Sequence, residues 1–104
     1  MQTQCLPLDV RCRIGGNDFV WNAAKAAANR RKHGVRFEDA ATVFLDPLFV
    51  MTDASRNEES RNAIIGFDHS GRLLFVVHIE IEGDHIRIVS ARCAERNEER
   101  LYAR

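Results

Sequence analysis

The sequence predicts one small α/β domain of the α+β type, in which helices pack against a mostly antiparallel sheet. Three observations predict this class. The second half of the chain alternates β-branched and aromatic runs with turn residues, the first half contains an alanine-rich run, and 104 residues are enough for one hydrophobic core. The expected order of elements is β-α-α-β-β-β-β-α, within residues 18–104.

Residues 1–17 lack the apolar block of a signal peptide, and we expect them to form an N-terminal leader in front of the domain. The net charge is zero, with 15 basic and 15 acidic residues, so composition alone does not indicate nucleic-acid binding. An odd number of cysteines fits a reducing cytoplasm. No apolar run reaches the roughly 20 residues that span a bilayer, and the histidine spacing indicates no metal site. We therefore expect a cytoplasmic protein without a membrane contact, a metal or a cofactor.

The first two elements are expected to be an edge strand and an alanine-rich helix. Phe19-Val20-Trp21 is short and apolar, which favours a strand. Asn22 is a good N-cap for the run 23–32, where helix propensity is very high. His33-Gly34 then ends the helix, because glycine readily adopts the left-handed conformation found after a helix C-terminus.

A second helix is expected over 36–45, where apolar residues recur at helical spacing until Asp46-Pro47 stops it. Residues 48–52 favour a strand, and residues 53–60 are polar enough to form a loop. The last element is expected to be a helix over 94–103, which is polar on almost all sides and therefore docks weakly or completes a functional surface.

Three consecutive strands are expected between the loop and the last helix: 61–67, 72–81 and 86–92. Gly83-Asp84 fits the two-residue turn of a β-hairpin. With this turn, Glu80 would oppose Arg87 and His78 would oppose Val89.

Alternation along these strands predicts two faces. The expected core face carries Leu73, Phe75, Val77, Ile79, Ile81, Ile86, Ile88 and Ile64. The other face is expected to carry Arg61, His78, Glu80 and Arg87 at one end, and Ile65, Phe67, Leu74, Val76, Val89 and Ala91 at the other. A connection of two or four residues at 68–71 gives the same faces, whereas a bulge there would turn Arg61 over.

Arginines, a histidine and a carboxylate that converge on an otherwise apolar sheet face indicate an anion-handling site. The alternative is a cross-strand row of salt bridges on a solvated face. A second basic feature is the run from Lys25 to Arg36, which contains no acidic residue. It is either a solvated helix face or a surface that contacts RNA phosphates.

Two motifs carry a family resemblance that extends from Phe19 nearly to the end. They are Arg31-Lys32-His33-Gly34-Val35 and Ile86-Arg87-Ile88-Val89-Ser90-Ala91-Arg92. In their order and spacing they resemble the BrnT family of bacterial type II toxins. The resemblance implies a RelE-like fold and a metal-independent endoribonuclease that cleaves RNA, free or ribosome-associated, and inhibits translation. It also implies neutralisation by a BrnA-like ribbon-helix-helix antitoxin, through which alone the complex would contact operator DNA.

The chain departs from the family pattern at two places of structural interest. Arg36 stands where a serine usually caps the second helix, and the loop 53–60 lacks the histidine that family members often carry there. Losing that cap is expected to cost about 1 kcal/mol.

Metal-free RNA cleavage needs a base for the 2′-hydroxyl, cations for the phosphate and an acid for the leaving 5′-oxygen. Arginine suits the phosphate, because its planar guanidinium binds two oxygens and stays charged. The expected catalytic residues are Arg61, Arg87 and Arg92 for the phosphate, His78 or Glu80 as base, and Glu98 or Tyr102 from the last helix. The expected RNA-binding residues are Lys25, Arg31, Lys32 and His33.

Each assignment has a structural alternative. His78 also fits a satisfied sheet histidine, Arg92 a cap for the last helix, and Glu98 with Tyr102 a packing pair. Two other functions also stay open. The chain could be a catalytically inactive toxin homologue that acts as a co-repressor subunit with its antitoxin, or a plain interaction domain.

Overall fold

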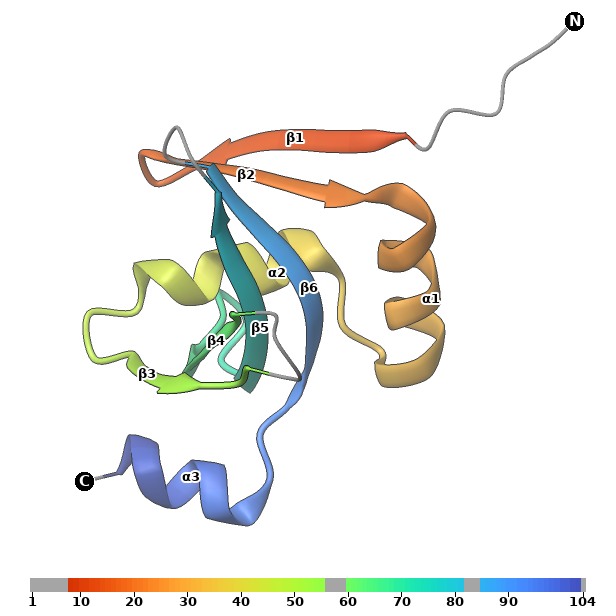
Figure 1. Ribbon diagram of the computed structural model, residues 1–104. Coiled ribbons are helices and arrows are strands. Elements are labelled where there is room, and N and C mark those ends of the chain that lie inside the picture. The colour runs from red at the N-terminus through yellow and green to blue at the C-terminus, as the bar shows by residue number, and fades with distance from the viewer. Residues whose placement is uncertain (1–7, 56–59, 82–84, 104) are drawn as a thin grey trace, which may run out of the picture.

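The computed structural model describes residues 8–55, 60–81 and 85–103. Its sheet has six strands in the order β1-β2-β6-β5-β4-β3, with β2 and β6 parallel and all other neighbours antiparallel (Figure 1). The strands are β1 (Asp9–Ile14), β2 (Asn17–Asn22), β3 (Val50–Asp53), β4 (Asn62–Phe67), β5 (Leu73–Ile81) and β6 (His85–Cys93). The helices are α1 (Ala23–His33), α2 (Phe37–Thr42), the 3₁₀ turn η1 (Val43–Leu45) and α3 (Arg96–Tyr102). The predicted α+β class with a mostly antiparallel sheet is confirmed.

Strand β1 is missing from the predicted order, because it lies inside the stretch 1–17 that was expected to be a leader. It pairs with β2 as a hairpin, and Val10, Cys12 and Ile14 pack against the core. Gly15 and Gly16 form the turn with φ angles of 59° and 86°. Two consecutive positive φ angles are the signature of a tight primed turn, so the Gly-Gly pair was a usable hairpin signal.

Helix α1 begins and ends where the sequence predicts. The Asn22 side chain accepts a hydrogen bond from the Lys25 N–H at 2.9 Å, which satisfies one of the free donors of the first turn. Gly34 ends the helix with φ 72° and donates to the Arg30 carbonyl. Both signals act locally, which is why the sequence locates this helix accurately.

Helix α1 is held against the sheet by Asn29, which is buried. Its amide donates to the carbonyls of Val35 and Ala91 at 3.0 and 2.8 Å and accepts from the Ala91 N–H at 3.0 Å. The ladder between β2 and β6 ends at Arg87. Asn29 therefore takes the place of a neighbouring strand at the free edge of β6, and α1 runs along that edge (Figure 1).

The second predicted helix divides into α2 and η1. Arg36 precedes α2 without a side-chain cap, as its identity predicts. Phe37, Ala40 and Val43 are fully buried, and Phe37 meets the Trp21 ring edge-on at 5.9 Å. These residues form one core with Leu74, Val76 and Ile88 on the sheet.

The predicted faces are wrong for β5, because both connections around it contain an odd number of residues. Phe67 pairs with Leu73, so the connection spans 68–72. Ile81 pairs with His85 on the other side; the predicted turn Gly83-Asp84 itself lies outside the described residues. A one-residue change of register moves every side chain of a strand to the opposite face. Two such changes turn β5 over while leaving β4 and most of β6 as predicted.

A β-bulge in β6 changes its faces again near the end of the strand. Val77 pairs with Ser90 and His78 with Ile88, so Val89 is the extra residue. Beyond the bulge Ala91 points into the core, although it was predicted on the other face. Alternation along the strand placed Arg92 on the core face. In the structure it pairs with Phe75 and lines a pocket on the opposite face.

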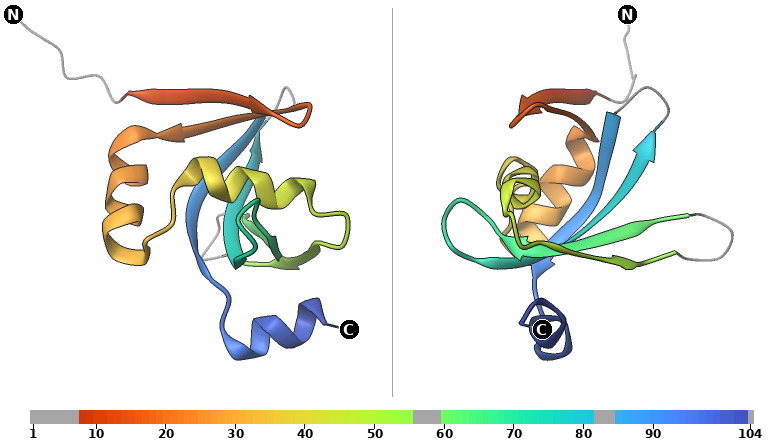
Figure 2. Two further views of the ribbon diagram at one scale, coloured as in Figure 1. Left: turned by 180° about the vertical axis from the view of Figure 1, so that it is seen from behind. Right: turned by 90° about the vertical axis from the view of Figure 1, so that its left-hand side faces the viewer.

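Helix α3 lies beyond the sheet, away from α1 and α2 (Figure 2). Tyr102 anchors it by packing edge-on against Phe67 at 5.2 Å and by donating to Asp46 at 2.7 Å. In the described part of the chain, no helix is long and apolar enough to cross a membrane.

Candidate functional site on the open face of the sheet

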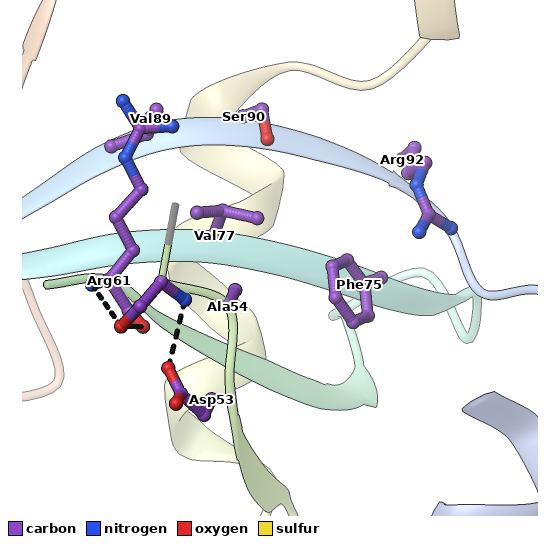
Figure 3. A pocket seen from close by; sticks show the side chains of 9 residues that line it. Asp53, Ala54, Arg61, Phe75, Val77, Val89, Ser90 and Arg92 are labelled. Atoms are coloured by element: carbon purple, nitrogen blue, oxygen red, sulfur yellow. Dashed lines mark hydrogen bonds between the residues drawn. The ribbon is translucent and has the colours of Figure 1, made fainter. Parts of the chain in front are cut away.

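A pocket of about 680 Å³ lies on the sheet face that α1 and α2 leave open (Figure 3). Its floor is apolar, and polar groups stand around it. The lining residues are Asp53, Ala54, Ser55, Arg61, Phe75, Val77, Val89, Ser90 and Arg92. The pocket thus has arginines on two sides, a carboxylate and two serines.

Arg92 is a firmly positioned cation of the pocket. Its two terminal nitrogens donate to the two carboxylate oxygens of Glu98 at 2.8 and 2.7 Å, and its guanidinium carbon lies 4.4 Å from the centre of the Phe75 ring. The Glu98 side chain raises the pKa of Arg92 further above its ordinary value. A paired and stacked guanidinium keeps one orientation, which a phosphate-binding group requires.

Glu98 has two structural tasks at once. It is 7% exposed, and besides Arg92 it accepts from the Glu95 N–H at 2.7 Å, closing a capping box at the start of α3. Burial would raise the pKa of Glu98, but the hydrogen bonds from Arg92 and the Glu95 backbone outweigh it, and the pKa lies below its usual value. Glu98 is therefore ionised at neutral pH and supports Arg92 instead of donating a proton.

Arg61 stands across the pocket from Arg92 (Figure 3). It immediately precedes β4, and its backbone is tied to the end of β3: its N–H donates to the Ser55 hydroxyl at 3.2 Å and its carbonyl accepts from Ala54 at 3.0 Å. The sequence prediction that Arg61 points to the open face agrees with this position.

The pocket also contains Asp53, Phe75 and Ser90, which were not predicted from the sequence as site residues. Hydrogen bonds from Ser55 to the Asp53 carboxylate lower the pKa of Asp53, so this carboxylate is charged at neutral pH. Phe75 and Ser90 reach the pocket only through the register and the bulge. The adjacent apolar pair Ile88-Val89 breaks the alternation of β6 and was the available signal for that bulge.

His78 is not in the pocket. It lies on the helix-covered side, 0% exposed, with its ring edge-on to Phe44 at 5.0 Å. Neither ring nitrogen makes a well-formed hydrogen bond to another described residue. Burial lowers the pKa of His78, and the nearby Val76 backbone and Glu80 carboxylate oppose this only in part. The prediction that His78 joins the arginines on the open face is wrong.

Acidification is expected to destabilise the protein through His78. Because the unfolded chain binds the proton more readily than the buried imidazole, stability falls as the pH drops from about 7 to about 5, by at most about 1.4 kcal/mol per pH unit for one proton. Urea unfolding of the wild type and of His78→Leu across this range tests it. The variant should lose this part of the slope; equal slopes would contradict the assignment. The pKa values of Asp46 and Asp68 are also lowered, but protonation of these carboxylates affects stability only below this pH range.

The other predicted catalytic residues are also apart from the pocket. Glu80 is exposed and pairs with Ile86, not with Arg87 as predicted. Arg87 points to the open face but forms an ion pair with Asp9 of β1 at 3.4 Å, five residues before Arg92. Tyr102 donates to Asp46, whose carboxylate raises the pKa of the phenol. Of the seven predicted catalytic residues, the structure brings Arg61 and Arg92 to one pocket, with Glu98 behind Arg92.

The predicted RNA-binding residues lie on α1. Lys25, Arg31 and Lys32 are exposed and His33 is half-buried. Among the described residues, no cluster of three or more His, Cys, Asp or Glu side chains has the arrangement of a metal site.

Comparison with known proteins identifies the class. Residues 21–98 match the family model for the ribonuclease toxin BrnT of type II toxin-antitoxin systems. The protein is therefore a toxin of the ribonuclease class from a type II toxin-antitoxin pair, a class that implies an RNA substrate and an antitoxin partner. The matched region makes up most of the sequence, and the chain belongs to the BrnT family.

A solved structure supports the fold independently. The 1.1 Å crystal structure of the Brucella abortus ribonuclease toxin BrnT is similar with a TM-score of 0.55 and 19% sequence identity, over 73% of this chain and 94% of that chain. At this identity the likeness bears on the fold alone. No match was found among curated protein sequences.

Proposed function

We propose that this chain is a metal-independent endoribonuclease that holds the scissile phosphate between Arg61 and Arg92. The observation that carries the proposal is the pocket itself, in which Arg61, just before β4, and Arg92 of β6 flank an apolar floor. A phosphate bound there would receive planar, permanently charged donors from opposite sides. The same donors would stabilise the extra negative charge that develops on the phosphate oxygens in the transition state.

Proton transfer is expected to contribute less to the rate of cleavage than phosphate binding by the arginines. Asp53 is the carboxylate that lines the described pocket, and we assign to it the acceptance of the 2′-hydroxyl proton. A base whose pKa lies well below the working pH accelerates proton transfer only modestly. In this proposal the arginines therefore supply most of the rate enhancement.

The proposed biological setting is the bacterial cytoplasm, where cleavage of messenger RNA would inhibit translation. We propose that the antitoxin is a BrnA-like ribbon-helix-helix protein that covers the open face, and that it alone contacts operator DNA. A pocket with two arginines would attract an acidic segment of that partner, which would compete directly with RNA phosphate.

The test uses the purified full chain and end-labelled RNA in excess EDTA. We expect cleavage to survive the chelator and to disappear in an Arg61→Ala, Arg92→Ala double variant. Removing one donor to a developing oxyanion typically costs about 10²–10³ in rate. Arg100→Ala, a surface arginine of α3, is the control and should cleave normally. Cleavage that stops in EDTA, or that persists in the double variant, would contradict the proposal.

A second candidate is a binding-only toxin homologue that acts as a co-repressor subunit. The observation that favours it is the position of His78, which leaves the described pocket without an imidazole base. Growth arrest on expression without the antitoxin, absent in the Arg61→Ala, Arg92→Ala variant, would argue against this candidate.

A further inference from the structure

Two lysines of α1, Lys25 and Lys32, lie beside the pocket, although the net charge of the chain is zero. Helix α1 runs along the free edge of β6, where Asn29 is hydrogen-bonded to both backbone groups of Ala91. Ser90 and Arg92 are the neighbours of Ala91 in the strand. Because Ala91 points into the core, these two neighbours point to the open face. The edge of the pocket and α1 are therefore adjacent.

Helix geometry decides which side of α1 faces the pocket. Successive residues are turned by about 100°, so Lys25 and Lys32 both lie within about 60° of Asn29, on one side of it. Ala26 lies about 60° away on the other side and packs against the core. Arg30 follows on that same side and lines a small hollow between α1 and α2 with Arg36 and Phe37. The two lysines thus point toward the open face of the sheet, where the pocket lies.

Both lysine side chains are available for a ligand. They are exposed, and among the described residues neither forms a salt bridge, whereas Arg36 pairs with Glu38 at 3.7 Å. They lie seven residues apart, which is about 10 Å along the helix, so they would meet different phosphates of one strand.

The surroundings of the lysines favour a phosphate chain over a protein partner. The other exposed residues of α1 are alanines and cations. Residues 22–37 include no acidic residue. Protein interfaces depend on large aromatic or apolar anchors, which this side of α1 lacks. A row of cations without such anchors is typical of contacts to a nucleic-acid backbone.

We infer that Lys25 and Lys32 continue the pocket as a track for the RNA chain, which would pass from the phosphate between Arg61 and Arg92 across the edge of β6 onto α1. This inference rests on the proposed function and adds the path of the substrate. It also divides the basic run into two parts: Lys25 and Lys32 contact the substrate, while Arg30 and Arg36 face α2 and do not.

The test measures binding of an uncleavable RNA of about 12 nucleotides, carrying 2′-O-methyl groups, over a series of salt concentrations. We expect Lys25→Gln, Lys32→Gln to weaken binding about tenfold and to reduce the slope of log K against log salt by about 1.4, the value for two phosphate contacts on a single strand. The matched control is Arg30→Gln, Arg36→Gln, which removes the same charge from the hollow between α1 and α2. It should change binding less than about twofold.

The result separates the track from the activity. Equal weakening by both double variants would mean unspecific attraction and would overturn the track, as would no effect from the lysine variant. Circular dichroism of each variant checks that α1 stays folded. Because the RNA cannot be cleaved, a chain that binds as expected but fails the EDTA assay would overturn the activity and leave the track intact.

Discussion

Asn29→Asp is expected to destabilise the protein by about 3–5 kcal/mol. The amide of Asn29 donates to two carbonyls, those of Val35 and Ala91. A carboxylate has no donor for either, and it would place a buried negative charge against both carbonyl oxygens. Since one contact joins α1 to the loop after it and the other joins α1 to β6, the whole edge of the sheet would lose its support. Urea unfolding at neutral pH measures the change.

Asn22→Asp is the matched control, because it makes the same substitution on the same helix. Asn22 uses only its oxygen, which accepts from the Lys25 N–H, and a carboxylate performs this task equally well. A negative charge at the helix N-terminus is also favourable, so this variant should be as stable as the wild type or more stable by about 0.3–1 kcal/mol. Similar losses in both variants would show that the hydrogen bonds of Asn29 are not the cause.

The behaviour of Asn29→Asp with pH gives a second check. Protonation restores one donor to the aspartic acid and removes its charge, so the folded variant binds a proton more readily than the unfolded chain. The deficit relative to the wild type should therefore shrink as the pH falls, until the unfolded carboxyl also becomes protonated. A deficit independent of pH would point to a packing defect.

The helices could be predicted from the sequence because their signals are local. Asn22 and Gly34 fix the ends of α1 through contacts within a few residues. The fold class follows from the same kind of information, together with the apolar runs. Strand β1 also carried a local signal in Gly15-Gly16, but residues 1–17, which lack an apolar block, were interpreted as a leader.

The pocket depended on information that the sequence contains only weakly. Whether a connection has an even or an odd number of residues decides the face of the next strand, and turn type alone did not settle this around β5. As a result, His78 lies in the core instead of on the open face, and Phe75 and Val77 lie on the open face instead of in the core. Arg61 kept its predicted face because the odd connections on the two sides of β5 offset each other, which leaves β4 in its predicted orientation relative to β6. Arg92 changed faces because of the bulge at Val89.

Glu98→Gln is expected to lower RNA cleavage about 10²-fold while leaving the chain folded, which would make Glu98 a positioning residue for Arg92. The substitution keeps the oxygen that accepts from the Glu95 N–H, but it turns the second oxygen, which accepts from Arg92 at 2.7 Å, into an amide donor. Two donors then face each other, and the guanidinium must move. A displacement of about 1 Å in a group that positions the substrate can cost about 10²-fold in rate.

Glu99→Gln is the control for this prediction. It removes the same charge from the neighbouring position of α3, where the side chain is exposed, and should cleave RNA at the wild-type rate. Single-turnover cleavage of both variants, with unfolding midpoints measured in parallel, distinguishes a local effect on Arg92 from a loss of negative charge. Equal losses in the two variants would exclude positioning.

A double-mutant cycle separates positioning from simple stabilisation of α3. If Glu98 acts through Arg92, adding Glu98→Gln to Arg92→Ala should not reduce cleavage further, because the group that Glu98 positions is already absent. If Glu98 only holds the helix, the two losses should multiply. The paired carboxylate oxygens of Glu98, both bound to one guanidinium that stacks on Phe75, favour the first result.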